Sequence, residues 1–592
     1  MSFLARLGAE LATIDGVLQT AWAYRGLKAD GLLTIADDIE KSCDRFATRP
    51  AFRFEGAEWS YAQFEARANR YAHWALGQGL KRGDVVALFM TNQPDYVACW
   101  MGLAKVGVVT ALVNSGLVGG PLAHCINISE AKHLIFSADL TEAVSSVRGQ
   151  FNAQPQEWAL EGNLATALLR APATRPAASH RDGLKSTDLA LYVFTSGTTG
   201  APKAARMTHL RVLGMLRAFI GGGHARESDR VYLTLPLYHG TGGLTGVGFA
   251  LERGGCILLK RKFSASHFWE DCAAENATVF FYIGELCRYL LNAPESPHER
   301  AHHLRLGVGN GLRPEVWEAF QARFNVPKML EFYGSTEGNA NLLNFDGKMG
   351  AVGRIPFWLK RTIRIRIIKF DVESEQPVRG PDGLCIEAEP DEPGEAIGEI
   401  LQNQARYKYE GYKGEAAQTE KKVLHDVFAK GDAWFRTGDL LRKDAAGYFY
   451  FVDRIGDTFR WKGENVSTNE VADVLSRAPG VTEANVYGVR VPGQDGRAGM
   501  AALTTEVGFS LEALHAHAHK ELPAFARPLF VRLMPAIETT GTFKYRKIDL
   551  VREGVDPALI HEPLYFDDPE ARAYTPWSAA LMEKMARGEI RV

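Results

Sequence analysis

Residues Leu189–His209 read LALYVFTSGTTGAPKAARMTH, and this stretch decides how the rest of the chain is interpreted. It begins with an apolar, β-branched and aromatic run, which is typical of a buried strand. Thr195–Gly200 then contains only hydroxyl residues and glycines, whose backbone N–H groups and short side chains suit a phosphate anion. Lys203 adds a positive charge, and Thr208 is expected to cap a following helix. The stretch therefore predicts a phosphate-binding loop after a buried strand.

The glycine spacing separates this loop from the Walker A loop. Gly197 and Gly200 are too close together, and no Gly-Lys-Ser/Thr sequence follows them. An ordinary polar turn between a strand and a helix is the alternative interpretation. The concentration of hydroxyls and glycines directly after a buried strand favours phosphate binding.

On both sides of the loop, helical patterns alternate with short apolar runs. From about Ala51 to Lys260, helix-like stretches such as YAQFEARANRYAHWALGQGL precede strand-like ones such as DVVALFM. This alternation indicates a parallel sheet covered by helices. A similar series runs from Cys256 to Phe332, so we expect two doubly wound units in tandem.

The pattern changes in the second half of the chain. Period-two alternation in TIRIRIIKF (362–370) predicts a strand with one solvated face, and residues 352–452 are expected to be mostly antiparallel. A smaller mixed region follows. The predicted fold class is α/β, with a large N-terminal domain of two doubly wound subdomains and a small β-rich subdomain (1–454). A small, mobile α+β C-terminal domain (455–592) completes the chain.

Composition and charge exclude several classes of protein. A chain of 592 residues is too long for one hydrophobic core, and a net charge of −2 gives no argument for nucleic-acid binding. The seven cysteines are scattered without a CxxC pair, which favours a reducing compartment over a disulfide framework or structural zinc. With no signal peptide or membrane span evident, we expect a cytoplasmic protein, either soluble or peripheral on the inner face of the cell membrane.

The N-terminal segment carries large apolar residues at helical spacing, namely Leu4, Leu7, Leu11, Ile14 and Leu18. This periodicity predicts an amphipathic helix whose apolar face docks on the protein. Contact with a membrane surface is the second interpretation, which the scarcity of Lys and Arg on the polar face disfavours.

Two later loops carry residue types that a nucleotide and a metal ion need. In EFYGSTEGN (331–339), Gly334–Glu337 follow a predicted strand, where a hydroxyl and a carboxylate together can hold a phosphate oxygen and Mg²⁺. Taken alone, this stretch is explained equally well as a polar loop. Gly307–Gly311 ends another strand with little side-chain bulk, which leaves room for a flat base.

Single polar residues in other motifs give weaker signals. Asp439 in RTGD follows a tight turn, where its carboxylate can accept bonds from two vicinal hydroxyls, and Arg454 ends a partly apolar strand. Lys544 lies in the Gly/Thr loop TTGTFKYRK and, alone, is more typical of a surface lysine. His239 follows Tyr238 and, alone, is more typical of a structural histidine.

Three histidines in LEALHAHAHKEL suggest a metal site. Only His515 and His519 share a helical face, because residues four apart are neighbours on a helix. We therefore interpret His515, His517 and His519 as surface residues.

Together, these motifs resemble the adenylate-forming superfamily of acyl-CoA synthetases, luciferases and peptide-synthetase adenylation domains. TSGTTGAPKAA is similar to the phosphate-loop signature of that family, and YGSTE, RTGD and the loop around Lys544 match further motifs in the family's order. The resemblance runs from about Ile35 to Asp567. Within the superfamily, YIGELCRYLL, GNGLRPEVW and DRIGDTFRWKGENVST are similar to the fatty acid transport protein/very long-chain acyl-CoA synthetase branch.

The resemblance implies a two-step reaction that uses ATP, Mg²⁺ and coenzyme A. A carboxylate attacks the α-phosphate of ATP to give an acyl-adenylate and pyrophosphate, and the CoA thiol then displaces AMP. A long- or very long-chain fatty acid is the implied substrate, and a bile-acid-like sterol acid or another bulky carboxylate is the alternative. A carrier-protein adenylation domain and a lipid-uptake protein coupled to acyl activation are further alternatives, and the oligomeric state is open.

The resemblance also implies roles for individual residues. Lys544 would bridge the carboxylate and the α-phosphate, Thr336 would bind the α-phosphate, Glu337 would bind Mg²⁺, and His239 would lie at a gate near the acyl pocket. The implied ATP- and CoA-binding residues are Thr195, Ser196, Gly197, Thr198, Thr199, Gly200, Lys203, Gly309, Asn310, Gly311, Phe332, Tyr333, Gly334, Ser335, Asp439, Arg454 and Gly463.

Two expectations concern movement and the acyl chain. In related enzymes the C-terminal domain rotates between the two steps, and the usual hinge position is Gly456 here rather than Asp or Lys. The glycine-rich run 240–248, with Phe280, Phe281 and Tyr282, is compatible either with a long apolar channel or with closely packed elements.

Overall fold

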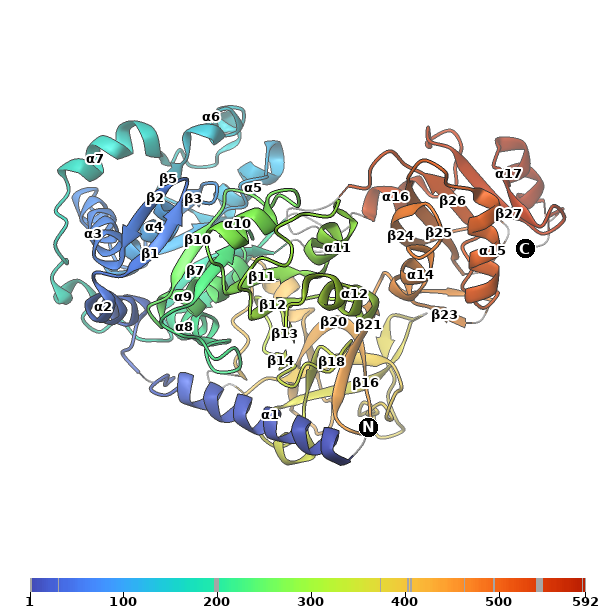
Figure 1. Ribbon diagram of the computed structural model, residues 1–592, viewed down its shortest axis with the longest axis horizontal. Coiled ribbons are helices and arrows are strands. Elements are labelled where there is room, and N and C mark those ends of the chain that lie inside the picture. Colours follow the sequence, from blue (N-terminus) through green and yellow to red (C-terminus); the bar gives the residue numbers. More distant parts are fainter. Residues whose placement is uncertain are drawn as a thin grey trace. The chain divides into compact units, whose positions relative to one another are not determined.

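The computed structural model describes residues 3–29, 31–195, 202–372, 374–401, 404, 407–462, 464–492, 494, 496–538, 547–587 and 589–590. Two compact units divide the chain. Unit 1 comprises Met1–Arg354 and Glu399–Val423, and unit 2 comprises Ile355–Gly398 and Leu424–Val592. Figure 1 shows their helices and strands. No described helix is both long enough and apolar enough to cross a membrane.

One six-stranded sheet in unit 1 carries the phosphate-loop stretch. Its order is β6-β5-β3-β4-β7-β8, and all neighbours are parallel except β7 and β8. The strands are β3 (Val85–Phe89), β4 (Val109–Leu112), β5 (His133–Phe136), β6 (Gln156–Ala159), β7 (Leu189–Thr195) and β8 (Lys203–Thr208). Strands such as β3 are buried along their whole length, which explains their unbroken apolar sequence.

The second sheet of unit 1 has eight strands in the order β14-β13-β12-β11-β9-β10-β1-β2. They are β1 (Pro50–Phe54), β2 (Ala57–Ser60), β9 (Arg230–Leu233), β10 (Cys256–Leu259), β11 (Val279–Ile283), β12 (Leu306–Asn310), β13 (Met329–Tyr333) and β14 (Leu342–Leu343). Two doubly wound sheets are confirmed, but their tandem arrangement is wrong. Strand β1 pairs in parallel with β10, with Phe52 opposite Ile257, so the first strand of the chain belongs to the second sheet and not to the sheet of β3–β8.

Helices cover these sheets, and a short β15 (Gly353–Arg354) ends the first segment of unit 1. The α-helices are α1 (Phe3–Ala23), α2 (Ile35–Phe46), α3 (Tyr61–Gly77), α4 (Pro94–Ala104), α5 (Gly119–Ser129), α6 (Thr141–Ser145), α7 (Ala165–Arg170), α8 (His209–Arg217), α9 (Val247–Leu251), α10 (Phe268–Ala274), α11 (Gly284–Asn292), α12 (Pro314–Phe324) and α13 (Ala416–Glu420). The predicted cap is confirmed, because the Thr208 side chain accepts a hydrogen bond from the Arg211 N–H at the start of α8.

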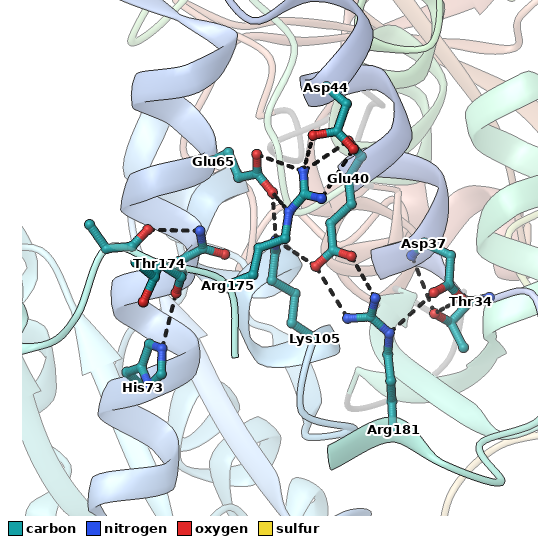
Figure 2. Close-up of polar contacts among 12 residues, drawn as sticks. Thr34, Asp37, Glu40, Asp44, Glu65, His73, Lys105, Thr174, Arg175 and Arg181 are labelled. Carbon is teal, nitrogen blue, oxygen red and sulfur yellow. Dashed lines mark hydrogen bonds and ion pairs between the residues drawn. The ribbon is translucent and has the colours of Figure 1, made fainter. Parts of the chain in front are cut away.

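A buried ion network fixes the segment that leads into β7 (Figure 2). Lys105, directly after α4, has a fully buried side chain whose Nζ lies 2.8 Å from Glu40 Oε1 and 3.2 Å from Glu65 Oε1. Arg175 and Arg181, from the segment between α7 and β7, pair with the same two carboxylates on α2 and α3. Opposite charges therefore hold this connection against α2 and α3, and Lys105 pairs with the same two carboxylates.

The orientation of α1 contradicts the predicted docking of its large apolar residues. Leu7, Leu11, Ile14 and Leu18 have exposed fractions of 46%, 58%, 40% and 64%. Small side chains face the protein instead, and a Cβ on Gly16 would lie 2.4 Å from the ring of Phe345. The backbone of α1 approaches unit 1 so closely that only small residues fit between them, which leaves the large residues outside.

Unit 2 contains an antiparallel sheet and a mixed α/β region. In the first sheet β21, β20, β18, β16 and β17 lie side by side, which confirms the predicted antiparallel region. Its strands are β16 (Ile365–Asp371), β17 (Gln376–Pro377), β18 (Gly394–Glu399), β19 (Val423–His425), β20 (Ala433–Lys443) and β21 (Tyr448–Arg454). The expected domain boundary after Arg454 falls between β21 and β22, inside unit 2, and stays a prediction.

The mixed region has a five-stranded sheet, β24-β25-β26-β27-β28, and the ribbon β22-β23. Its strands are β22 (Phe459–Trp461), β23 (Glu464–Val466), β24 (Val481–Val489), β25 (Ala498–Thr505), β26 (Phe530–Leu533), β27 (Leu564–Asp568) and β28 (Ala573–Pro576). Its helices are α14 (Thr468–Leu475), α15 (Leu511–Glu521), α16 (Ile548–Glu553) and α17 (Ala579–Ala586). This region has a hydrophobic core of its own, as an independent domain needs.

Candidate active site

The two ends of the predicted phosphate loop are paired strands. Thr195 at the end of β7 lies opposite Lys203 at the start of β8. The loop residues Ser196–Gly200 lie outside the described residues. Lys203 Nζ donates a hydrogen bond to Gln418 Oε1 at 3.2 Å and lies 5.5 Å from the ring centre of Tyr412. The antiparallel pair thus places a lysine at the point where the loop rejoins the sheet.

Tyr412 links this hairpin to Glu337. The segment around Tyr412 continues the sheet edge, because the Arg206 N–H donates to Gly411 O at 3.2 Å and the Lys413 N–H donates to Ala204 O at 3.0 Å. The Tyr412 hydroxyl donates to Glu337 Oε1 at 2.9 Å. Burial, together with the charge of Glu337, raises the pKa of Tyr412, so the phenol keeps the proton that it donates. Sequence reasoning missed Tyr412; the aromatic cluster in YKYEGYK (407–413) was the available signal.

A partly buried arginine holds the backbone on both sides of Glu337. Arg211 on α8 donates from Nε to Thr336 O at 2.8 Å and from Nη2 to Gly338 O. Burial lowers the pKa of Arg211, and the charge of Glu337 opposes that shift. The Gly338 N–H also donates to Ser335 Oγ at 3.1 Å. The loop that carries Thr336 and Glu337 is therefore fixed through its main chain, an arrangement that sequence reasoning missed.

Glu337 suits a magnesium ion that also binds substrate phosphates. Mg²⁺ in such sites usually takes one or two carboxylates and completes its shell with phosphate oxygens and water. The Tyr412 hydroxyl donates a hydrogen bond to Oε1 of Glu337 and so orients the carboxylate. The other oxygen, Oε2, is not used in this bond and would be the metal ligand. One oriented carboxylate on a fixed loop fits this coordination chemistry.

The glycine-rich end of β12 lies between two neighbouring strand ends. Gly309 is opposite Tyr282 on β11 and Glu331 on β13, so Gly309–Gly311 and Phe332–Tyr333 leave the same edge of the sheet. A Cβ on Gly309 would lie 2.2 Å from Tyr282 O. Asn310 Oδ1 is buried and has no hydrogen-bond partner among the described residues, as expected for a group that accepts a bond from a ligand.

Glu331 holds this edge of the sheet through hydrogen bonds. Its side chain is buried, and it accepts hydrogen bonds from the Tyr282 hydroxyl at 2.7 Å and the Leu312 N–H at 3.0 Å. Burial raises the pKa of Glu331 to about 8. Gly311 adopts φ +78°, which favours glycine. Glu331 thus positions the turn that follows β12, a role that sequence reasoning missed.

His239 lies beside the Thr336 loop. Its ring centre is 4.4 Å from that of Tyr238, and a Cβ on the next residue, Gly240, would lie 3.6 Å from Thr336 Oγ1. The glycines that follow are tightly packed: a Cβ on Gly243 would lie 1.8 Å from Leu237 O. Phe280, Phe281 and Tyr282 are also buried. Of the two interpretations of this region, the structure supports close packing.

Unit 2 carries the predicted ribose-binding pair. Asp439 on β20 is opposite Arg454 on β21, with Arg454 Nε 3.9 Å from Asp439 Oδ1. The Asp439 N–H donates to Thr437 Oγ1 at 3.1 Å, which fixes the turn before the carboxylate. Gly456 has φ +93°, a conformation that favours glycine. Gly463 and Lys544 lie outside the described residues.

The predicted residues therefore form two groups in the described parts of the chain. Thr195, Lys203, His239, Gly309–Gly311 and Phe332–Glu337 belong to unit 1, and Asp439 and Arg454 belong to unit 2. The first group can hold phosphate, a metal ion and a flat base. The second can accept hydrogen bonds from hydroxyl groups.

Known proteins resemble this chain over most of its length. A profile of the AMP-binding enzyme family matches residues 39–401, and one of the AMP-binding enzyme C-terminal domain matches residues 470–544. Long-chain fatty acid transport protein 6 of Mus musculus is 42% identical over 574 residues, covering 95% of this chain and 92% of that protein. Long-chain fatty acid transport protein 1 of Homo sapiens is 43% identical over 548 residues, covering 90% and 84%.

Solved structures share the fold. ATP-bound MatB from Rhodopseudomonas palustris has a TM-score of 0.73 and 22% identity, covering 88% of this chain and 99% of that chain. A fatty acyl CoA synthetase from Mycobacterium tuberculosis has a TM-score of 0.61 and 24% identity, covering 88% and 98%. These structures confirm the predicted fold class, a large N-terminal α/β domain with a smaller C-terminal domain.

Proposed function

The chain belongs to the AMP-binding enzyme family, and we propose that it is a ligase that joins a long- or very long-chain fatty acid to coenzyme A. The reaction would use ATP and Mg²⁺, proceed through an acyl-adenylate, and release AMP and pyrophosphate. Adenylate-forming chemistry follows from the family. The fatty acid is supported by relatives that are over 40% identical across most of both chains and are named long-chain fatty acid transport proteins.

The observation that carries the proposal is the fixed Thr336–Glu337 loop. Arg211 holds the loop through carbonyl groups on both sides of Glu337, and Tyr412 orients the carboxylate. In the first step a carboxylate oxygen bonds to the α-phosphorus and the bond to the pyrophosphate oxygen breaks. The Thr336 hydroxyl would bind the α-phosphate in that step. Glu337 would hold Mg²⁺, which neutralises charge on the phosphates when bound.

The hairpin of β7 and β8 would bind the leaving group. Thr195–Gly200 would donate backbone and hydroxyl hydrogen bonds to the β- and γ-phosphates, and the positive charge of Lys203 would stabilise the departing pyrophosphate. No general base is required, because a carboxylic acid is already ionised at neutral pH.

Other residues would bind the nucleoside and serve the second step. Gly309–Gly311 with Phe332–Tyr333 would border the adenine, and Asn310 Oδ1 would accept a hydrogen bond from its amino group. Asp439 would accept bonds from both ribose hydroxyls. Lys544 would bridge the carboxylate and the α-phosphate, and Gly463 would adjoin the pantetheine after the C-terminal domain rotates about Gly456.

The alternative substrates stay within the same chemistry. Activation of a bile-acid-like sterol acid or of another bulky carboxylate would use the same phosphate loop. The same loop would serve if the protein takes up lipid and couples that uptake to acyl activation. Because the glycine-rich run is closely packed, we propose that the acyl chain binds outside that run. The choice of acid therefore rests on the relatives.

We also propose that the enzyme is cytoplasmic and binds peripherally to the inner face of the cell membrane. Leu7, Leu11, Ile14 and Leu18 form an outward apolar stripe on α1. At the end of the stripe, a cavity of about 430 Å³ is lined by Trp22 and by more basic than acidic side chains; the basic ones are Arg25, Lys41, Arg45, Arg217 and Arg253, and the acidic ones are Asp38 and Glu252. Apolar residues beside a basic cavity suit an interface with anionic lipid.

A panel of carboxylates tests the proposed activity. Acids from short to very long chain, with a bile acid and benzoate, are each incubated with ATP, Mg²⁺ and CoA, and AMP and acyl-CoA are measured. Long-chain acids are expected to give equal amounts of AMP and acyl-CoA. Preference for the bile acid would support the sterol-acid alternative, and failure of every acid to give AMP would contradict the ligase.

A further inference from the structure

Two histidines and an aspartate converge in unit 2, outside the residues assigned to catalysis. His515 Nε2 lies 3.1 Å from Asp567 Oδ1, and His519 Nε2 lies 3.1 Å from Asp567 Oδ2. The potential ligand atoms of the three residues all lie within 4.8 Å of one another. In the described part of the chain, this is the one group of three or more His, Cys, Asp or Glu residues with that geometry.

The position of these histidines corrects their interpretation as surface residues. The side chain of His515 is 14% exposed and that of His519 is 34% exposed. Their rings stack with centres 3.9 Å apart, so both Nε2 atoms point to the same carboxylate. Asp567 comes from β27, a strand that the sequence did not place next to α15.

We propose that His515, His519 and Asp567 form a Zn²⁺ site. Two imidazole nitrogens and one carboxylate oxygen are ligands that Zn²⁺ prefers, and histidines four apart on a helix present both nitrogens to one ion. The fourth position would be taken by water from the open side, where His519 is exposed. On binding, the imidazoles are neutral with their proton on Nδ1, and the carboxylate is ionised.

The surrounding structure holds the three ligands in place without the ion. The Asp567 N–H donates to Leu529 O at 2.9 Å, which anchors β27. Arg527 Nη2 donates to His519 O at 3.0 Å, which fixes the end of α15. The ring of Tyr574 packs edge-on against His515, with centres 5.5 Å apart. Binding would therefore require small side-chain adjustments and little backbone ordering.

The site would join α15 to strand β27, which lies beyond the part of the C-terminal domain that the family profile matches. The match to the AMP-binding enzyme C-terminal domain ends at residue 544, so it includes both histidines but not Asp567. The strands β27 and β28 lie beyond that match. Zn²⁺ would thus cross-link α15 to β27 and stabilise the fold of this region. This role does not depend on the proposed catalytic function.

His517 supplies a matched control for the test. It lies on the same helix, but its Nε2 is 2.9 Å from Val474 O, away from Asp567. The full-length protein is freed of metal with EDTA, and Zn²⁺ binding is followed by titration calorimetry. Co²⁺ is then substituted, and the intensity of its visible absorption reports whether the ion is tetrahedrally coordinated.

One Zn²⁺ per chain is the expected stoichiometry, and zinc should raise the melting temperature, because a ligand that binds only the folded state stabilises it. His519→Gln and Asp567→Asn should each weaken binding at least about tenfold. His517→Gln should leave it unchanged. His515→Gln is the second variant if one of these does not fold. Absence of binding by the wild-type protein, or equal loss in His517→Gln, would overturn the site.

Discussion

Tyr412 and Glu337 are joined by a 2.9 Å hydrogen bond although 75 residues separate them in the chain. The tyrosine belongs to the segment that extends the β7–β8 hairpin, and the glutamate belongs to the loop after β13. This single bond connects the segment beside the proposed phosphate-binding loop to the proposed magnesium ligand.

Replacement of Tyr412 by Phe tests that connection. The Glu337 carboxylate would lose the donor that orients it, so kcat/KM for adenylate formation should fall about 10- to 100-fold, with a higher magnesium requirement. ATP–pyrophosphate exchange at varied Mg²⁺ measures both effects. Tyr450→Phe, which removes a hydroxyl bonded to Asp444 in unit 2, is the control and should leave both unchanged. An unchanged magnesium dependence in Tyr412→Phe would contradict the role of this bond.

The two half-reactions should separate in Lys544→Ala. Loss of the bridging charge should abolish formation of the acyl-adenylate, because that step develops charge between carboxylate and α-phosphate. Thioester formation from a supplied acyl-adenylate should largely survive. Both steps are followed by chromatography of acyl-adenylate and acyl-CoA, and an equal loss in both would rule out the proposed role of Lys544.

Glu331 should make the free energy of unfolding depend on pH near neutrality. The pKa of Glu331 is raised to about 8 in the folded protein from an ordinary value of 4.5, so the folded state binds a proton that the unfolded state releases. This contribution is complete below pH 4.5 and is lost as pH rises through about 8, at up to about 1.4 kcal/mol per pH unit.

Glu331→Gln should remove this dependence. The amide oxygen can still accept from the Leu312 N–H, and the amide nitrogen can donate to Tyr282. Urea unfolding from pH 5 to 9 should therefore show a smaller decline in stability than in the wild-type protein. If both proteins decline equally, the pKa of Glu331 is not the cause.

The buried Lys105 should matter more for folding than for chemistry. Lys105→Met leaves Glu40 and Glu65 with less compensating charge in a buried position, and loss of one partner from such a pair typically costs about 3–5 kcal/mol. Urea unfolding measures the loss. Lys132→Met, which removes an exposed lysine paired with Asp84, should cost less than about 1 kcal/mol. Similar costs for the two variants would argue against the buried network.

Membrane binding through α1 should be sensitive to one leucine. Leu18→Glu places a charge on a side chain that is 64% exposed and should weaken binding to vesicles of phosphatidylcholine with phosphatidylglycerol about tenfold. Gln19→Glu adds the same charge to the neighbouring exposed residue without removing apolar surface, so it should have a smaller effect. Sedimentation with vesicles measures both, and high salt should weaken all binding. Equal effects of both variants would mean that the apolar stripe does not enter the lipid.

Features that depend on neighbouring residues could be predicted from the sequence alone. The apolar run of β7, the hydroxyl and glycine content of Thr195–Gly200, and the Thr208 cap are local patterns, and the structure confirms the strand and the cap. The order of the motifs along the chain was sufficient to indicate the family. A linear pattern records such features directly, because it contains all the residues that make them.

Contacts between side chains that are far apart in the sequence became visible only in the folded chain. Arg211 reaches Thr336 across 125 residues, and Glu331 reaches Tyr282 across 49, because sheet order brings separate strand ends together. The outward orientation of the leucines of α1 also depends on contacts with residues far away in the sequence. Helical periodicity specifies an apolar face but not its orientation, and close contact at small residues such as Gly16 turned that face to the outside.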